Sequence, residues 1–472
     1  MALVLAIDQG TTGTTCLAVS DGLAVLGRGY RELAQHFPQP GWVEHDAEEI
    51  WQSVLGAAGD ALAAAGAAPS ELDAIGIANQ RETTVVWDRR SGSPVGRAIV
   101  WQDRRTADRC AELPYDLIRG RTGLVPDPYF SATKLEWLLA RASGDLAFGT
   151  VDSWLAWKLS GEHVTDVSNA SRTLLAALAT LDWDDELLAL FGVPRSVLPR
   201  IVSSAGPVAE ADLLGARVPI AGIAGDQQAA LFGQACFAPG DAKATYGTGS
   251  FVLVNTGGDC GPPPEGLVRT AAWRIGDEAP VYALEGSVFV TGAALQWLRD
   301  GLGLLGSAAE AEALARSLPS NEGVWFVPAL TGLGSPYWRP DARGLIAGLT
   351  RGTRREHLVR AALEAVAHQT QDVLDAMGAR LSVLRADGGG AANAFLMQLQ
   401  ADLARVPVEV PAERETTALG AAALAGVGAG LWTQAGLAEA WRRAARYEPE
   451  LPESEAVEQR AGWREAVARA LL

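Results

Sequence analysis

The chain has 472 residues, of which 48% are hydrophobic and 20% charged, and its formal net charge is −17. One hydrophobic core rarely supports a chain of this length, so two domains of roughly 200–250 residues are expected. The acidic balance argues against nucleic acid as a partner, because phosphate backbones are bound through an excess of Lys and Arg. It does not exclude a small phosphorylated ligand, which backbone amides and Mg²⁺ can bind locally.

The cysteines and the N-terminus indicate a cytoplasmic protein. The four cysteines are scattered without a Cys-x-x-Cys pair, as is typical of reduced thiols in the cytosol. The first residues lack the basic start and the length of a signal peptide. No apolar run approaches the ~20 residues that cross a bilayer, so no stable membrane insertion is expected.

The first half of the chain predicts alternating strands and helices. Residues 3–7 form a continuous apolar run, as in a strand buried on both faces, and a Gly/Thr turn separates it from a second run at 16–19. Residues 47–68 are alanine-rich and predict a helix closed by Pro69, and strands are expected at 75–78 and 83–87. This alternation indicates an α/β domain.

A second strand–turn–strand unit occurs in the other half. Residues 244–246 and 251–254 flank a Gly/Thr turn in the same way as the N-terminal pair, after an expected strand at 218–223. A helical apolar stripe follows at 357–377, then a strand at 381–386. One such hairpin in each half predicts two related domains facing each other, with the boundary near 235–240 and domains at 1–237 and 238–472.

Three Gly/Thr-rich turns are candidate phosphate contacts. The turn at 8–15, Asp-Gln-Gly-Thr-Thr-Gly-Thr-Thr, exposes backbone N–H groups and hydroxyls, and Asp8 at the strand end suits Mg²⁺ or its waters. Taken alone, this turn is equally well explained as a tight hairpin. The turns at 245–250 and 387–393 are also simple turns when considered singly, but three of them together suit a triphosphate and its adenosine.

Two further segments could bind or activate a hydroxyl group. Arg81 and Glu82 stand side by side at a strand end, where Arg could donate to hydroxyls and Glu accept from them, although an isolated Arg-Glu is more often an exposed ion pair. Asp226 opens a predicted helix, where an N-cap is the commoner role. Phosphorylating an alcohol requires a carboxylate to accept the hydroxyl proton, and Asp226 is the best-placed candidate.

Two nucleotide motifs are rejected. A Walker P-loop is excluded because no Lys in the chain follows a Gly. Residues 301–306 match the Rossmann fingerprint letter by letter, but they follow the helix-like segment 293–300 rather than a strand.

Together these segments are similar to the FGGY carbohydrate kinases, and within that family to the glycerol kinases. The matching stretches cover nearly the whole chain, in order, and lie at 8–12, 40–46, 79–84, 99–102, 127–131, 225–233, 245–249, 296–300, 330–334, 336–338, 387–389 and 417–422. The Arg-Glu-Thr-Thr block at 81–84 and the Gly-Asp-Gln-Gln block at 225–228 separate glycerol kinases from the sugar kinases of the family.

The resemblance implies two actin-like (ribonuclease H-like) α/β domains around a catalytic cleft. The implied reaction is ATP-dependent phosphorylation of glycerol to sn-glycerol 3-phosphate, the first step of glycerol catabolism, in a homo-oligomer of two or four copies. Asp226 would be the general base, and Asp8 would position Mg²⁺. The resemblance assigns glycerol to Arg81, Glu82, Tyr129, Asp226 and Gln227, with Trp101 and Phe251 as an apolar wall, and ATP to Thr11, Thr12, Gly13, Thr248, Gly292, Gln296, Gly389 and Asn393.

The chain departs from its relatives at two places. Glycerol kinases usually carry an Arg at the position of Thr15, and its loss should weaken ATP binding or slow transfer unless another Arg substitutes. The segment 211–218 is shorter than the loop with which enterobacterial-type members bind fructose 1,6-bisphosphate, so no such inhibition is expected. Two alternatives stay open: a kinase for another short polyol or ketose, such as erythritol or dihydroxyacetone, and an actin-like ATP-binding protein that senses or assembles.

Overall fold

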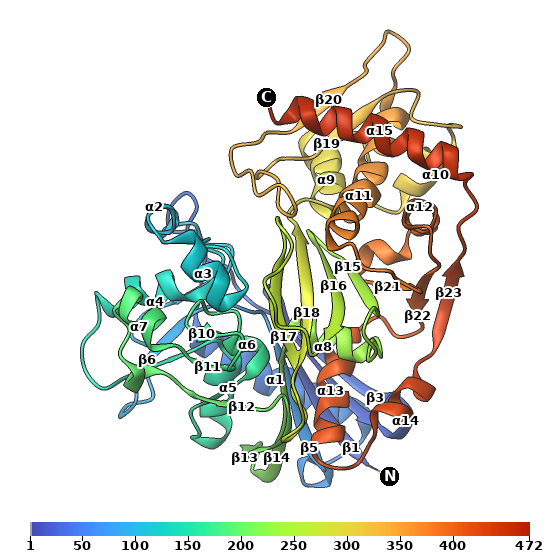
Figure 1. Ribbon diagram of the computed structural model, residues 1–472. Helices are drawn as coiled ribbons and strands as arrows, with labels where there is room; N and C mark the ends of the chain where they lie inside the picture. The colour runs from blue at the N-terminus through green and yellow to red at the C-terminus, as the bar shows by residue number, and fades with distance from the viewer. Residues whose placement is uncertain (1) are drawn as a thin grey trace.

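The computed structural model describes residues 2–472 and contains two large mixed β-sheets with helices around them (Figure 1). In spatial order, the first sheet consists of β13 (Ala205–Leu213), β14 (Ala216–Gly225), β5 (Ala74–Asn79), β1 (Leu3–Gln9), β2 (Gly13–Ser20) and β3 (Ala24–Glu32). The second consists of β17 (Val268–Trp273), β18 (Val281–Val288), β16 (Ser250–Gly257), β15 (Ala242–Tyr246), β21 (Leu384–Asp387), β22 (Val408–Pro411) and β23 (Arg443–Tyr447).

The two sheets share one plan. In the first, β1 pairs antiparallel with β2 and parallel with β5, and β3 and β14 extend the two sides. In the second, β15 pairs antiparallel with β16 and parallel with β21, and β18 and β22 extend the two sides. The expected α/β class with a related hairpin unit in each half is therefore confirmed. The expected domain division after residue 237 falls between α8 and β15 and stays a prediction.

Residues 2–472 also contain fifteen α-helices and five small two-stranded ladders. The helices are α1 (Ala47–Ala65), α2 (Ala107–Ala111), α3 (Tyr115–Thr122), α4 (Ser131–Leu139), α5 (Val151–Ser160), α6 (Val167–Ala170), α7 (Asp185–Phe191), α8 (Asp226–Gly233), α9 (Gly292–Gln296), α10 (Glu310–Arg316), α11 (Arg355–Met377), α12 (Ala394–Ala404), α13 (Thr416–Gly428), α14 (Gln434–Ala440) and α15 (Glu453–Ala470). The ladders pair β4 (Glu44–His45) with β7 (Ala98–Ile99), β6 (Val85–Asp88) with β8 (Leu146–Gly149), β9 (Val164–Asp166) with β12 (Arg200–Val202), β10 (Ala176–Ala177) with β11 (Asp182–Trp183), and β19 (Trp325–Val327) with β20 (Leu345–Ala347).

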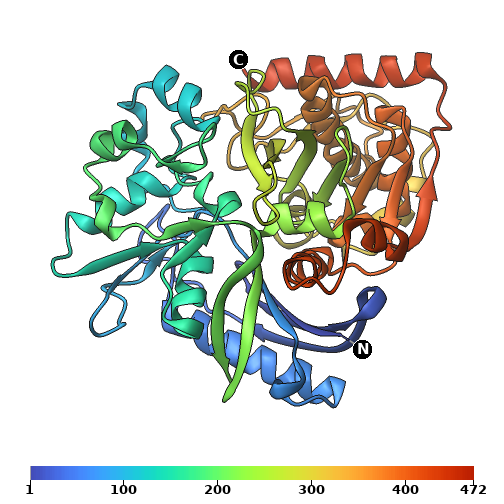
Figure 2. The same ribbon diagram turned by 60° about the horizontal axis from the view of Figure 1, so that its bottom comes forward.

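Helix α13 comes from the second half of the chain but packs on the first sheet, beside α8 (Figures 1 and 2). The approach is so close that a Cβ atom on Gly76 of β5 would lie 2.0 Å from the carbonyl oxygen of Ala421. A Cβ on Gly420 would lie 1.8 Å from the carbonyl oxygen of Ala229 in α8. Small residues thus allow α8 and α13 to join the two halves of the chain in one shared core.

The observed ends of two predicted elements, α1 and β21, differ from the prediction. Helix α1 starts after Asp46, whose side chain accepts from the N–H groups of Glu48 and Glu49. It ends before the predicted residue 68, because Gly66 adopts a left-handed conformation (φ 66°). Strand β21 begins at Leu384 rather than at residue 381.

Two further expectations concern helices. As expected, residues 301–306 follow α9 and a π-helical turn at Trp297–Gly301, not a strand. No helix within residues 2–472 combines the length and the apolar character that a bilayer span requires.

Candidate active site

A strained turn after β5 presents Arg81 and Glu82. Glu82 has φ 61°, which non-glycine residues rarely adopt, and the N–H of Thr83 donates to the carbonyl of Arg81 at 2.7 Å. The hydroxyl of Ser131 donates to the carbonyl oxygen of Glu82 at 3.0 Å and braces the turn from α4. Because of this turn, the expected strand 83–87 begins only at residue 85.

The guanidinium of Arg81 is the hub of a buried polar network. Its Nη1 and Nη2 atoms lie 2.5 and 3.0 Å from the two carboxylate oxygens of Glu285 on β18. Its Nε lies 3.2 Å from Oδ1 of Asp226, and Nη2 donates to the hydroxyl of Tyr129 at 3.2 Å. Arg81 and Glu82 are only 2% and 1% exposed, so the alternative of an exposed ion pair is wrong.

Sequence reasoning missed two members of this network, Arg172 and Glu285. Arg172 Nε donates to Glu82 at 2.6 Å, and its Nη2 donates to Glu285 at 3.0 Å. The two arginines hold the pKa of Glu285 at about 2, although its burial acts in the opposite direction. A detectable signal existed, since Glu285 is the one charged residue in the apolar segment Val281–Val288.

Asp226 lies at the first position of α8, at the carboxyl end of β14. Gly225 holds the N-cap position, so the alternative that Asp226 is an N-cap is wrong. Its Oδ1 accepts from the backbone N–H of Gln227 at 2.7 Å, and the side chain is 29% exposed. The carboxylate is therefore oriented by Arg81 but still accessible.

Gln227 is oriented from the second sheet. The ammonium of Lys243, on β15, donates to Oε1 of Gln227 and, at 2.7 Å, to Oγ1 of Thr245. Because an ammonium group can only donate, Gln227 must turn its oxygen toward Lys243. Its amide NH₂ is then available as a donor to another group.

The predicted aromatic wall is present beside Arg81. The ring of Trp101 lies 5.5 Å from that of Tyr129 and 6.3 Å from that of Phe251, both nearly edge-on. The guanidinium of Arg81 faces Phe251 at 5.7 Å. Trp101 Nε1 donates to Oγ1 of Thr11 at 2.9 Å, which connects the wall to the turn between β1 and β2.

Thr11 and Thr12 lie in that turn, Asp8 lies near the end of β1, and Gly13 begins β2. Burial raises the pKa of Asp8 well above its usual value, and the carboxylates of Asp226 and Glu415 raise it further. Asp8 is therefore close enough to Asp226 for their charges to interact. Thr12 is exposed, Thr11 half-buried, and the N–H of Gly10 donates to the carbonyl of Gly13 at 2.9 Å.

Thr15 is the position at which the family resemblance predicts a missing positive charge. Thr15 lies opposite Asp8 in the β1–β2 ladder and is buried. Arg28, on β3, forms an ion pair of 2.6 Å with Glu415, which is one of the carboxylates that act on Asp8. A guanidinium of the first sheet is thus engaged by a carboxylate from the second half of the chain.

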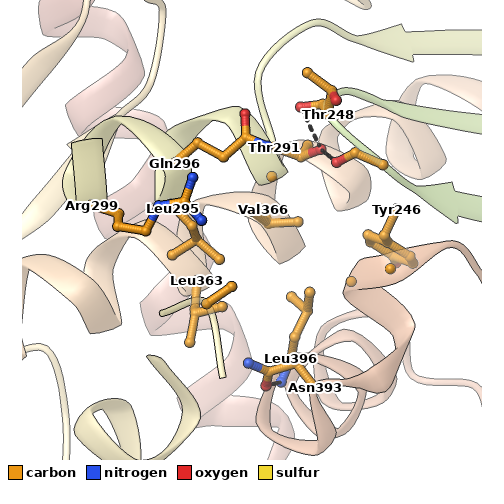
Figure 3. A pocket seen from close by; sticks show the side chains of 15 residues that line it. Tyr246, Thr248, Thr291, Leu295, Gln296, Arg299, Leu363, Val366, Asn393 and Leu396 are labelled. Carbon is orange, nitrogen blue, oxygen red and sulfur yellow. Dashed lines mark hydrogen bonds between the residues drawn. The ribbon is translucent and has the colours of Figure 1, made fainter. Parts of the chain in front are cut away.

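A cavity of about 320 Å³ lies in the second half of the chain (Figure 3). Leu363, Val366 and Leu396 give it an apolar interior, and Arg299 and polar groups surround that interior. Its lining includes all five residues predicted for this side of the nucleotide: Thr248, Gly292, Gln296, Gly389 and Asn393. An apolar slot with a few polar groups at its edge suits a flat heterocycle.

Hydrogen bonds brace the cavity wall around the turn at 245–250. The hydroxyl of Thr291 donates to the carbonyl oxygen of Thr248 at 3.3 Å (Figure 3), and the N–H of Gly292 donates to the carbonyl of Gly247 at 3.0 Å. The structure thus gathers the predicted hydroxyl-binding residues around Arg81, and the predicted nucleotide residues around this cavity and the turn after Asp8. Their roles as ligands stay predictions.

The chain matches one family over both halves. The pattern of the N-terminal domain of the FGGY family of carbohydrate kinases matches residues 3–233, and that of the C-terminal domain matches residues 242–429. Relatives include a glycerol kinase of Citrifermentans bemidjiense, 52% identical over 100% of this chain and 99% of its own, and one of Dechloromonas aromatica, 55% identical over 99% and 97%. The crystal structure of Plasmodium falciparum glycerol kinase with ADP superposes with a TM-score of 0.93, at 35% identity, and covers 100% of this chain and 99% of that one.

Proposed function

The chain belongs to the FGGY family of carbohydrate kinases and is a phosphotransferase, and we propose that it transfers the γ-phosphoryl group of ATP to glycerol, forming sn-glycerol 3-phosphate and ADP. The observation that carries this proposal is the contact of Arg81 with both Asp226 and Tyr129 in one buried cluster. Such a cluster offers a short polyol several donors and acceptors and a carboxylate base.

Asp226 is the general base of this proposal. Its partly exposed carboxylate accepts the hydroxyl proton as the new P–O bond forms, while Arg81 and the N–H of Gln227 fix the orientation of the carboxylate. Arg81, Glu82, Tyr129, Asp226 and Gln227 bind the hydroxyl groups, and Trp101 and Phe251 contact the carbon atoms. The aromatic side chains also exclude water that would otherwise attack the nucleotide.

The residues around Asp8 fit a magnesium ion. Burial raises the pKa of Asp8, and the charge of Asp226 raises it further, so a cation beside Asp8 would stabilise its ionised form. Within residues 2–472 no three His, Cys, Asp or Glu side chains converge, so Asp8 would hold Mg²⁺ together with phosphate oxygens and water, as is usual for this ion. Bound there, Mg²⁺ would neutralise phosphate charge.

ATP binds between the two halves of the chain in this proposal. The adenosine occupies the cavity lined by Gly292, Gln296, Gly389 and Asn393, and the phosphates meet Thr248 on one side and Thr11, Thr12 and Gly13 on the other. The two turns lie at equivalent places in the two related sheets, each between the first two antiparallel strands, which supports a nucleotide held by both.

A coupled assay of ADP release, with and without glycerol, tests this function. We expect release to depend on both glycerol and Mg²⁺, with glycerol 3-phosphate identified by mass spectrometry. Erythritol and dihydroxyacetone should give a lower kcat/KM than glycerol. A higher value for either would assign the enzyme to that substrate, and ADP release independent of any alcohol would support an actin-like ATPase instead. A homo-oligomer of two or four copies stays a prediction from the family resemblance, and a cytoplasmic location stays a prediction from the cysteines and the N-terminal residues.

A further inference from the structure

Two charged residues of the second sheet are buried against the substrate-side cluster of the first half. Glu285 on β18 and Lys243 on β15 are both 0% exposed. Glu285 contacts Arg81, which lies 204 positions earlier in the chain, and Lys243 contacts Gln227. Burying ionised side chains is costly unless each is paired, so a sheet that needed only a packed core would not carry them here.

We propose that Glu285 and Lys243 are positioning residues, through which the half of the chain that carries the nucleotide cavity orients Arg81 and Gln227 for the alcohol substrate. The inference rests on the proposed function, because it takes Arg81 and Gln227 as ligands of that substrate. Neither Glu285 nor Lys243 needs to touch the substrate itself.

The geometry of the Arg81–Glu285 pair explains the first assignment. Two parallel N–H···O contacts fix the plane of the guanidinium, which leaves Nε to face Asp226 and lets Nη2 also reach Tyr129. Glu285 also separates Arg81 from the second buried guanidinium, that of Arg172. Without its charge the two arginines would repel each other, and Arg81 would turn toward Asp226 and occupy the oxygens that the base needs.

The second assignment follows from the chemistry of an ammonium group. Lys243 can only donate, and Gln227 and Thr245 are its hydrogen-bond acceptors. It therefore keeps the carbonyl oxygen of the Gln227 amide away from the substrate side and leaves the NH₂ group to donate to a hydroxyl. Replacing Lys243 by Met removes this constraint, so that the amide can rotate.

Steady-state kinetics of Glu285→Gln and Lys243→Met test the proposal. We expect the KM for glycerol to rise at least about tenfold in each, since an oriented hydrogen bond to a charged group is lost, while the KM for ATP changes less than about twofold. In Glu285→Gln, kcat should fall as well. An unchanged KM for glycerol in both variants, or an equal rise in both KM values, would overturn the inference.

Matched controls come from the same chain. Glu409 is also a buried glutamate of the second sheet that pairs with arginines, at 2.7 Å from Arg443, 2.6 Å from Arg446 and 3.9 Å from Arg385. It lies on β22 and takes no part in the cluster around Arg81. Lys158 pairs with Glu48 at 3.0 Å. Glu409→Gln and Lys158→Met should keep both KM values near those of the wild type.

A double-mutant cycle separates positioning from packing. If Glu285 acts through Arg81, Glu285→Gln should lower kcat/KM for glycerol little further in an Arg81→Met background. Fully additive losses would show that Glu285 only stabilises the fold. Glu285→Asp keeps the charge and should give a KM for glycerol between those of the wild type and Glu285→Gln. If Glu285→Gln does not fold, this variant tests whether Glu285 positions Arg81. A wild type without glycerol-dependent ADP release would refute the proposed function, whereas an active wild type with unaffected variants would refute only this inference.

Discussion

The Nε atom of Arg81 lies 3.2 Å from Oδ1 of Asp226, so the side chain expected to bind a substrate hydroxyl also orients the carboxylate expected to take its proton. A planar guanidinium can serve both tasks because it carries five N–H donors in a fixed geometry. The backbone N–H of Gln227 holds the same oxygen at 2.7 Å, so the carboxylate has two independent supports.

Replacing Asp226 by Asn should therefore separate binding from chemistry. The amide keeps the shape of the carboxylate but accepts no proton, so kcat should fall by about 10²–10⁴-fold, while the KM for glycerol stays within a few-fold. Steady-state rates at saturating ATP measure both. Asp341→Asn, which alters an exposed pair with Arg339, is the control. Near-normal turnover of Asp226→Asn would refute the assigned base.

Restoring a cation at position 15 should strengthen the binding of ATP. Thr15 lies opposite Asp8, beside the turn that we expect to hold the phosphates, so Thr15→Arg should lower the KM for ATP several-fold. Thr15→Val removes the hydroxyl without adding charge and should leave that KM higher than in Thr15→Arg. If a folded Thr15→Arg binds ATP no better, Arg28 or another group already supplies the charge, and the loss of Arg at this position has no cost.

The titration of Lys134 should make the free energy of unfolding depend on pH. Its buried ammonium donates to the carbonyls of Pro128, Tyr129 and Phe130 at 2.8–2.9 Å, and burial lowers its pKa to about 8 from 10.5. Between these two values the unfolded chain binds the proton and the folded chain does not, so stability rises with pH in that window as the cost of the buried charge disappears.

Urea denaturation at pH 7 and pH 9.5 checks this sign. The free energy of unfolding of the wild type relative to Lys134→Met should be larger at pH 9.5 than at pH 7. Lys134→Met should also raise the KM for glycerol, because the backbone that carries Tyr129 loses its donor. A difference that shrinks with pH would contradict the prediction.

Fructose 1,6-bisphosphate should not inhibit this enzyme. The segment between β13 and β14 is a two-residue turn, in which Leu214 and Gly215 both have positive φ (51° and 83°) between the paired residues Leu213 and Ala216. Such a turn has no room for a loop that wraps a bisphosphate. Titrating the compound into the glycerol-dependent assay should leave the rate unchanged, and saturable inhibition would contradict this.

Local patterns were enough to predict most of the strands of the two hairpins and their turns. Short runs of three to five mostly apolar residues, separated by Gly and Thr, identify β1–β2 and β15–β16, because buried strands and tight turns have strong local preferences. The ends of α1 and β21 were less well predicted, since a single left-handed glycine or a local turn decides them.

The candidate site was predicted in part for the same reason. Asp8 lies near the end of β1, Arg81 comes two residues after β5, and Asp226 directly follows β14. These three strands are neighbours in the first sheet, so residues at strand ends were the right ones to single out. Whether Arg81 is exposed and whether Asp226 caps a helix could not be predicted from the neighbouring residues in the sequence. Both depend on partners from elsewhere in the chain, such as Glu285 for Arg81.

By itself, the sequence determined the α/β class, the turn at 8–15 with its Asp8, and a family resemblance over nearly the whole chain, because these depend on short stretches of neighbouring residues. Only the tertiary structure decided that Glu285, Arg172 and Lys243 surround the predicted hydroxyl-binding residues. The packing of the two sheets brings Glu285 to Arg81 across 204 positions and Lys243 to Gln227 across 16, and no local preference specifies such contacts. The folded core makes that pairing necessary, since an unpaired charge buried there would be too costly.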